Sequence, residues 1–294
     1  GSMSLKINAL IVGILFFQCS KKEQTAEQVQ SLPFESKPVM STISPGFIDE
    51  ASGITASLSH PGHLWVQQDG GNPAEIVLIN EKGLIKKRLL LKTAYNRDWE
   101  DLSSGAGPIK DSNYLYIAET GDNSQSHYSY SIFRFKEPHP GTDTIFQFEK
   151  INFRYPDGSH DAEAIFVSKQ ADIYIITKRD SVSKIYKLPY PQNTATTVTA
   201  IAVGKLAFTK VTGAAYSGAD NEILIKTYNN IYYWKLSENE LPEMVLSRKP
   251  TELGYEAEPQ GEAICFHANN LGFYTLSEKP FYVSAVALNF YKRK

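Results

Sequence analysis

A peptide pattern that recurs at intervals of about 50 residues constrains the fold more than any other feature of this chain. In four copies a glutamate precedes a small or acidic residue and then an apolar run, and in one copy glycine stands in place of the glutamate. The copies begin at Glu50, Glu100, Glu163, Gly213 and Glu262. Such a period marks a repeat architecture, in which one unit cannot bury its apolar face alone.

Short strands after each copy identify the type of repeat. A strand rich in β-branched and aromatic residues is expected about 12 to 20 residues after each anchor, followed by a third strand. The expected second strands are Leu64–Val66, Leu115–Ile117, Ile173–Ile176, Ile223–Ile225 and Phe273–Leu276. The expected third strands are Ile76–Ile79, Ser131–Phe135, Lys184–Leu188, Ile231–Leu236 and Tyr282–Val286. A fourth strand precedes the next copy, and four strands per unit are typical of a β-propeller blade.

The two ends of the chain supply complementary parts of one blade. Lys37–Ile43 is a strand without an anchor of its own, and the last copy supplies only three strands before Lys294. We therefore predict an all-β, five-bladed β-propeller closed by the N-terminal strand, which completes the C-terminal blade and removes exposed edges. Six blades remain the alternative, because the 63-residue interval between Glu100 and Glu163 has room for an extra hairpin.

The composition indicates the size of the core and excludes one class of partner. The chain has 294 residues, of which 42% are hydrophobic, enough for a large core without disulfides or metals as staples. Thirty basic and 32 acidic residues give a net charge of -2, so we expect no basic face and no nucleic-acid partner. We expect a single propeller domain over residues 35–294, present as a monomer.

The N-terminal segment, residues 1–19, is typical of a secretory signal that follows an expression remnant. After Gly1–Leu5 and Lys6 comes an apolar run, Ile7–Phe17, which is too short to span a bilayer. Cys19 follows this run and resembles the acylated cysteine of lipoprotein signals, although a non-acylated signal or a buried segment remains open. Residues 20–34 are polar, as a flexible tether would be. We therefore expect an extracytoplasmic protein, periplasmic or at the cell surface, held at the membrane only by lipid on Cys19.

The repeated glutamates are candidates for a site. In a propeller the starts of the innermost strands face one end of the central channel, so Glu50, Glu100, Glu163 and Glu262 are expected to converge there. Clustered carboxylates repel one another, so some must be protonated, paired with cations or bound to a metal. The alternative is that each glutamate accepts backbone N–H groups of the next blade and acts as a clip between blades.

The residues that leave the second strands form a second candidate ring. They differ from blade to blade, which indicates a specific ligand, although ordinary salt bridges would also explain the charged ones. With two of the glutamates, the expected ligand-binding residues are Glu50, Asp69, Glu119, Lys178, Arg179, Lys226, Tyr228, Glu262 and Glu278. Lys226 and Tyr228 lie on the side where Gly213 replaces the carboxylate, and are expected to admit an anionic or hydroxylated ligand.

A calcium site is expected where acidic residues are densest. Two polar turns, Asp69–Asn72 and Gly121–Asn123, offer oxygen ligands at short spacing, but such residues also make ordinary turns. Asp98 lies beside Glu100, which places the most acidic part of the ring between the second and third blades. The expected metal ligands are Glu100, Asp101, Asp122, Asn123, Asp161 and Glu163.

Several of these stretches together resemble a known group of proteins. They are Glu50–Ile54, Trp65–Asn72, Asp98–Leu102, Leu115–Asn123, Tyr155–Gly158 and Asp161–Ala164. Over roughly residues 40–290 the chain resembles bacterial secreted propellers of the SdiA-regulated and phytase-like (esterase-like) families. The resemblance implies a propeller, often with calcium, and for most members no assigned activity. The sequence departs from a true calcium phytase in having no dense acidic calcium cluster, which puts phosphatase activity in doubt.

Two function classes remain open. The first is a lipid-anchored propeller that binds a cation, a small polar ligand or a protein partner at an acidic channel mouth. The second is a hydrolase, phosphoesterase-like, esterase-like or glycosidase, in which ring carboxylates act as acid and base. Carboxyl groups about 5 to 10 Å apart around an open cleft would favour hydrolysis. The chain has no Gly-x-Ser-x-Gly elbow, HExxH helix, P-loop or paired CxxC motif.

Overall fold

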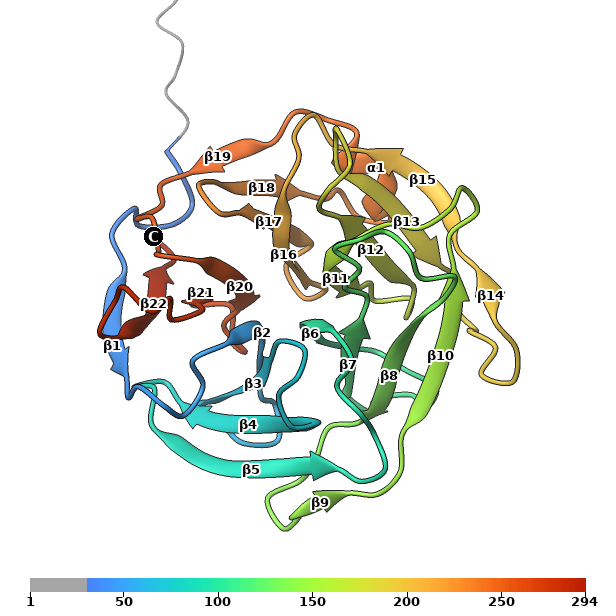
Figure 1. Cartoon of the computed structure of the whole chain (residues 1–294). Coiled ribbons are helices and arrows are strands. Elements are labelled where there is room, and N and C mark those ends of the chain that lie inside the picture. The colour runs from blue at the N-terminus through green and yellow to red at the C-terminus, as the bar shows by residue number, and fades with distance from the viewer. Residues whose placement is uncertain (1–30) are drawn as a thin grey trace, which may run out of the picture. The chain divides into compact units, whose positions relative to one another are not determined.

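The computed structural model describes residues 31–294, which form five antiparallel β-sheets arranged as blades in a ring (Figure 1). In each blade the first strand lies nearest the centre of the ring, and the later strands follow outward. The helix found within these residues is one short segment, α1 (Pro242–Leu246), between the third and fourth strands of blade 4. The predicted all-β, five-bladed propeller is confirmed.

Each blade contains four strands in order from the centre of the ring to its outer edge. Blade 1 contains β2 (Ala51–Ala56), β3 (His63–Gln68), β4 (Glu75–Asn80) and β5 (Ile85–Leu91). Blade 2 contains β6 (Trp99–Gly105), β7 (Tyr114–Glu119), β8 (Tyr130–Lys136) and β10 (Glu149–Arg154). Blade 3 contains β11 (Ala162–Val167), β12 (Ile173–Thr177), β13 (Lys184–Leu188) and β15 (Ile201–Lys205). Blade 4 contains β16 (Val211–Ser217), β17 (Glu222–Thr227), β18 (Ile231–Lys235) and β19 (Thr251–Leu253).

Blade 5 is assembled from both ends of the chain, as predicted. It contains β20 (Gly261–Phe266), β21 (Gly272–Ser277), β22 (Val286–Lys292) and β1 (Val39–Ile43). The N-terminal strand β1 pairs antiparallel with β22, from Val39 opposite Phe290 to Ile43 opposite Val286. The predicted third strand at Tyr282–Val286 was wrong, because Tyr282 lies exposed in the loop that precedes β22.

The propeller begins earlier than the predicted boundary at residue 35. The compact unit starts at Leu32, and Phe34 is only 2% exposed because its ring packs edge-on against Phe273 and Tyr233. The end of the predicted tether over residues 20–34 is therefore part of the folded core. The predicted signal, Cys19 and the rest of the tether lie outside the described residues. Within residues 31–294 no helix is long and apolar enough to cross a membrane.

The long interval between Glu100 and Glu163 holds a strap instead of an extra blade. Its additional residues include the short strand β9 (Thr144–Ile145), which reaches back and pairs in parallel with β5 of blade 1. A second strap, β14 (Val198–Thr199), extends from blade 3 and pairs in parallel with β10 of blade 2. The six-bladed alternative is therefore wrong, and the insertion fastens neighbouring blades to each other.

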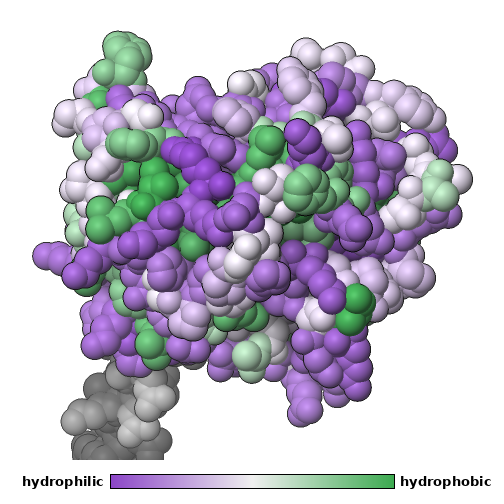
Figure 2. Space-filling model, turned by 90° about the horizontal axis from the view of Figure 1, so that it is seen from below, coloured by the Kyte–Doolittle hydropathy of each residue, from purple (hydrophilic) through white to green (hydrophobic). Residues whose placement is uncertain are grey.

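Burial follows the distance from the centre of the ring. The innermost strands β2, β11 and β20 are buried at every position, whereas the outer strand β5 alternates between exposed and buried residues. One hydrophobic cluster joins Tyr116 of β7 to Ile165 of β11, so the core lies between blades as the repeat argument requires. Figure 2 shows the outer side of the propeller on which β5 and β9 lie. Its surface is largely hydrophilic, and the hydrophobic residues gather mainly in one patch.

Candidate functional site

Every innermost strand carries a β-bulge near its start, and the bulge decides which side chain faces the end of the channel. The residues skipped in the pairing register are Ser52, Glu100, Glu163, Thr212 and Glu262. A bulge re-aims the side chain it carries, so these five are structurally equivalent. This corrects the sequence repeat, in which Glu50 was placed two residues too early and Gly213 one residue too late.

Where the bulge carries a hydroxyl residue, that residue joins two blades. Ser52 Oγ donates to the carbonyl of Trp99 at 3.2 Å, and Thr212 Oγ1 donates to the carbonyl of Gly261 at 3.1 Å. Glu50 is exposed and accepts a hydrogen bond from Asn72 Nδ2 at 2.6 Å. The expected ring of four glutamates is therefore a ring of three, at Glu100, Glu163 and Glu262.

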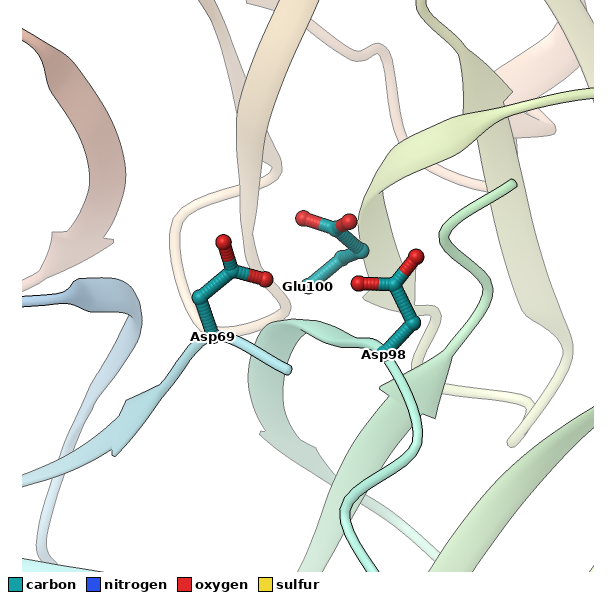
Figure 3. Close-up of side chains that lie close together, drawn as sticks. All are labelled: Asp69, Asp98 and Glu100. Carbon is teal, nitrogen blue, oxygen red and sulfur yellow. The ribbon is translucent and has the colours of Figure 1, made fainter. Parts of the chain in front are cut away.

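Three carboxyl groups from neighbouring segments meet in a first cluster (Figure 3). Asp69 follows β3, Asp98 precedes β6 and Glu100 lies within β6, and one oxygen of each lies within 4.8 Å of the others. No lysine, arginine or histidine nitrogen of residues 31–294 pairs with them within 4.0 Å. Burial, then the neighbouring carboxylates, raise the pKa of Asp69 to about 6. The same causes hold the pKa of Glu100 well above its usual range.

Backbone contacts hold this first cluster in place. The buried Asn96 accepts the N–H of Trp99 at 3.0 Å and donates to the carbonyls of Gln68 and Asp69 at 3.0 and 2.9 Å. It thereby fixes the loop before β6 against the loop after β3. Sequence analysis did not single out Asn96, because a single asparagine in a loop has no periodic signal.

Two glycines allow the chain to pass close to the carboxylates. A Cβ at Gly121 would collide with the carboxyl groups of Asp98 and Glu100, and a Cβ at Gly70 would lie 2.8 Å from Asp98 Oδ1. The two polar turns noticed in the sequence therefore matter mainly for their glycines, since only glycine lacks the atom that would fill this space.

A second cluster shares Glu100 with the first. One oxygen each of Glu100, Asp161 and Glu163 lies within 4.8 Å of the others, and all three residues are buried. Glu163 Oε1 accepts from Lys178 Nζ at 2.5 Å, whereas the buried Glu163 Oε2 has no hydrogen-bond partner among residues 31–294. An unpartnered buried carboxylate oxygen is costly unless a ligand satisfies it.

A chain of polar groups continues from this cluster across three blades. Lys178 Nζ donates to the hydroxyl of Tyr228 at 2.8 Å, and that hydroxyl donates to Glu262 Oε1 at 2.9 Å. Burial lowers the pKa of Lys178, but the Glu163 and Glu262 carboxylates outweigh that effect and raise it. The sequence grouped these residues correctly at one end of the channel. In this structure they bond to one another.

Asp101, expected as a metal ligand, is instead a clip between blades. It is fully buried, and its carboxylate accepts the N–H of Leu102 at 2.8 Å and the N–H of Ile165 in blade 3 at 2.9 Å. Its position just after the bulge turns the side chain toward the next blade, away from Glu100. A clip between blades was the alternative role expected for the repeated glutamates. In the structure Asp101, the residue after Glu100, has this role.

Asp122 and Asn123 do not point into the clusters either. Asp122 accepts the N–H groups of Ser126 and His127, both at 2.9 Å, and the hydroxyl of Tyr130 at 2.6 Å, so it organises its own loop. Asn123 is exposed and accepts from Arg179 Nη2 at 2.6 Å. The expectation that these two residues help to hold calcium is therefore wrong.

Arg179 and Asp161 form the edge of the second cluster. Arg179 Nε donates to Asp161 Oδ2 at 2.7 Å, and Asp161 Oδ1 accepts the N–H of Asp122 at 2.7 Å. Both oxygens of Asp161 are thus engaged with the protein, so Asp161 is a weaker candidate ligand than Glu100 or Glu163.

The remaining predicted ligand residues have mixed outcomes. Glu119 accepts the N–H of Arg97 at 3.1 Å, outside both clusters. Lys226 is fully buried and donates to the carbonyls of Thr227 and Gly261 and to the hydroxyl of Tyr255, so it does not reach a ligand as expected. Burial lowers its pKa to about 8.

Glu278 is close enough to the carboxyl groups at this end of the channel for their repulsion to help raise its pKa. Burial, then repulsion by Glu262 and Asp69, raise its pKa to about 8. We call this end of the channel the acidic mouth, defined by seven carboxyl residues: Asp69, Asp98, Glu100, Asp161, Glu163, Glu262 and Glu278.

The opposite end of the channel holds a cavity of about 470 Å³ that the sequence did not indicate. Its lining comes from the far ends of the innermost strands and includes Thr55, Ser104, Val167, Tyr216 and Phe266. None of the carboxyl groups of the acidic mouth lines it. Small and hydroxyl side chains at strand ends are common in any sheet, so the sequence had no signal for this cavity.

Comparisons with known proteins add little to the fold. No family model matches the chain, and no curated protein matches its sequence. Among solved structures, one described as a streptogramin B lyase structure is 12% identical with a TM-score of 0.44, over 88% of this chain and 100% of that one. A nidogen/laminin complex is 9% identical with a TM-score of 0.46, over 77% of this chain and 72% of that one. Such distant likenesses concern the propeller fold and say nothing about the acidic mouth.

Proposed function

We propose that this protein is a binding propeller whose acidic mouth holds a cation, with calcium as the ion of choice. The observation that carries the proposal is the sharing of Glu100 by two carboxylate clusters, each with oxygens within 4.8 Å of one another. Glu163 Oε2 is buried and has no hydrogen-bond partner within residues 31–294, and a bound cation would supply that partner.

The donor set suits a hard cation. Calcium takes six to eight oxygen ligands, and the two clusters together offer carboxylate oxygens of Asp69, Asp98, Glu100 and Glu163, with Glu100 common to both. A bound cation would supply positive charge where repulsion now raises the pKa values of Asp69 and Glu100. The chain's own contribution is to hold these groups together through Asn96, Gly70 and Gly121.

The same spacing favours binding over hydrolysis. A glycosidase places a substrate or water between two carboxyl groups about 5 to 10 Å apart. Here one oxygen of each carboxyl group in a cluster lies within 4.8 Å of the others, close enough for a single ion to contact all three. The phytase-like resemblance of the sequence, which implies calcium in many members, also favours a cation at this end.

Calcium titration is the direct test of this proposal. Wild-type protein treated with chelator is expected to bind calcium in isothermal titration calorimetry. Glu100→Gln combined with Glu163→Gln should weaken binding at least about 100-fold, because it removes the shared carboxylate and the unpartnered oxygen. Binding should also tighten as pH rises from about 5 to about 7, since the acid form of Asp69, whose pKa is about 6, must lose its proton.

The matched control is Glu119→Gln, which removes a carboxylate outside both clusters. It should leave calcium affinity unchanged. Absence of binding to the wild type, or a double variant that binds as the control does, would reject the cation site.

We further propose that the propeller is lipid-anchored outside the cytoplasm through Cys19, on the strength of the apolar run Ile7–Phe17 that precedes it. In the native precursor, Cys19→Ser is expected to prevent acylation and to release a soluble propeller. Membrane fractionation with immunoblotting is the measurement. Retention of the Cys19→Ser variant in the membrane would mean that the apolar run is itself the anchor.

A further inference from the structure

Five loops form a continuous rim around one half of the acidic mouth. They lie at residues 44–50, 69–74, 92–98, 120–129 and 278–285. Backbone hydrogen bonds join them in turn: Lys279 N–H to Asp49 O, Asp69 N–H to Glu50 O, Gly71 N–H to Asn96 O, and Gly121 N–H to Asp98 O. Because neighbouring loops are bonded, side chains on them share one surface, which we call the rim.

The rim carries most of the exposed aromatic residues. Of the seven aromatic residues described as exposed within residues 31–294, five lie on it: Phe47, Tyr95, Tyr128, Phe281 and Tyr282. Phe281 is 96% exposed and Tyr282 is 66% exposed, with their rings edge to face. Exposed aromatic residues gathered on adjacent loops are typical of binding surfaces, because each ring offers a large contact area at low entropic cost.

The same half of the mouth has more acidic than basic residues. Asp69, Asp98 and Glu278 have no ion pair within residues 31–294. The cations of the mouth, Lys178 and Arg179, lie on the blade 3 side and are already bonded to Glu163 and Asp161. The rim loops also carry Lys92, Arg97 and Lys279, but six acidic residues outnumber them: Asp49, Glu50, Asp69, Asp98, Asp122 and Glu278. The rim therefore combines aromatic rings with an excess of acidic residues.

We infer that the rim docks a basic, extended segment of another protein. A lysine or arginine of that segment enters between Asp69 and Glu278, and its neighbours pack on Phe281 and Tyr282. Guanidinium and ammonium groups are attracted both to carboxylates and to aromatic faces, so one ligand chemistry explains both features. A neutral sugar would stack on the rings but would not relieve the repulsion between the carboxylates.

This inference deepens the proposed function by naming the partner class, and it rests on that function in using the same acidic mouth. It does not depend on calcium. Asp69 is also a candidate calcium ligand, so calcium and the partner's cation would compete for it. Without calcium, Asp69 and Glu278 stay available when Glu100 and Glu163 are replaced, and the two proposals can be tested separately.

The test uses fluorescein-labelled hexa-arginine, with hexa-glutamate as the charge control, in fluorescence anisotropy with chelator-treated residues 31–294. Hexa-arginine is expected to bind at least about tenfold more tightly than hexa-glutamate, and less tightly as salt rises. Phe281→Ala with Tyr282→Ala should weaken binding about tenfold, and so should Asp69→Asn with Glu278→Gln. The charge variant should also reduce the salt dependence.

Matched controls separate this site from general attraction to an acidic surface. Phe146→Ala removes an aromatic residue that is 72% exposed but follows β9, away from the rim, and Glu238→Gln removes an exposed carboxylate in blade 4. Both should bind hexa-arginine as the wild type does. Equal losses in the rim and control variants, or no preference for hexa-arginine, would overturn the inference.

Two further outcomes are decisive. Binding of maltohexaose that the Phe281→Ala and Tyr282→Ala changes abolish, without hexa-arginine binding, would assign the rim to carbohydrate and reject the basic partner. Hexa-arginine binding to a wild-type protein that binds no calcium would support this inference and reject the cation site alone.

Discussion

A chain that begins at Gly46, with every residue up to Pro45 removed, is expected to aggregate and to lose its cooperative unfolding transition. The deletion removes β1, which covers the edge of β22, and an uncovered edge strand is a template for association. It also removes Phe34 and Ile43, two buried side chains worth about 1.5 to 3 kcal/mol each. Since a typical domain is stable by about 5 to 15 kcal/mol, this is a large fraction of the total.

Size-exclusion chromatography and a thermal melt decide the outcome. The control begins at Leu32 and keeps both β1 and Phe34, so it is expected to remain monomeric with an unchanged melting temperature. If the chain from Gly46 stays monomeric with the melting temperature of this control, pairing of β1 with β22 does not stabilise the propeller.

Replacement of Asp101 by alanine is expected to destabilise the propeller by about 2 to 5 kcal/mol while leaving calcium binding unchanged. The change leaves the buried N–H groups of Leu102 and Ile165 without an acceptor, at about 1 to 3 kcal/mol for each. Urea unfolding gives the free energy, and calorimetry gives the calcium affinity.

Glu100→Gln is the matched control on the adjacent residue. Glu100 accepts no backbone N–H of residues 31–294, and its carboxylate is repelled by Glu163, Asp69 and Asp98, so its replacement should cost little stability. It should, however, weaken calcium binding. Stability unaffected by Asp101→Ala, or calcium binding lost with it, would show that Asp101 belongs to the site and is not a clip.

The sequence by itself determined the architecture, because that depends on a signal spread over the whole chain. The recurring anchors with their short apolar strands predicted blades, and the anchorless Lys37–Ile43 predicted closure with the last blade. One strand was misplaced where local pattern and burial disagree. The expected third strand of the last blade began at Tyr282, yet Tyr282 is exposed on the rim and the strand begins at Val286.

The sequence also indicated where acidic side chains come together. It placed the most acidic part of the ring between the second and third blades, and Glu100 and Glu163 do meet there. It could not assign different roles to Glu100 and Asp101. Both are acidic and adjacent in one strand, and only the structure shows that their side chains point in different directions.

Only the tertiary structure decided which acidic residues form the mouth. A bulge in each innermost strand shifts the facing residue by one, which aligns Ser52, not Glu50, with Glu100. Asp69 and Asp98 become neighbours only when Asn96 bonds one loop to the next. Alternation along a strand shows which residues are apolar, but the position of a bulge and the contact between two loops depend on the packing of one blade against another.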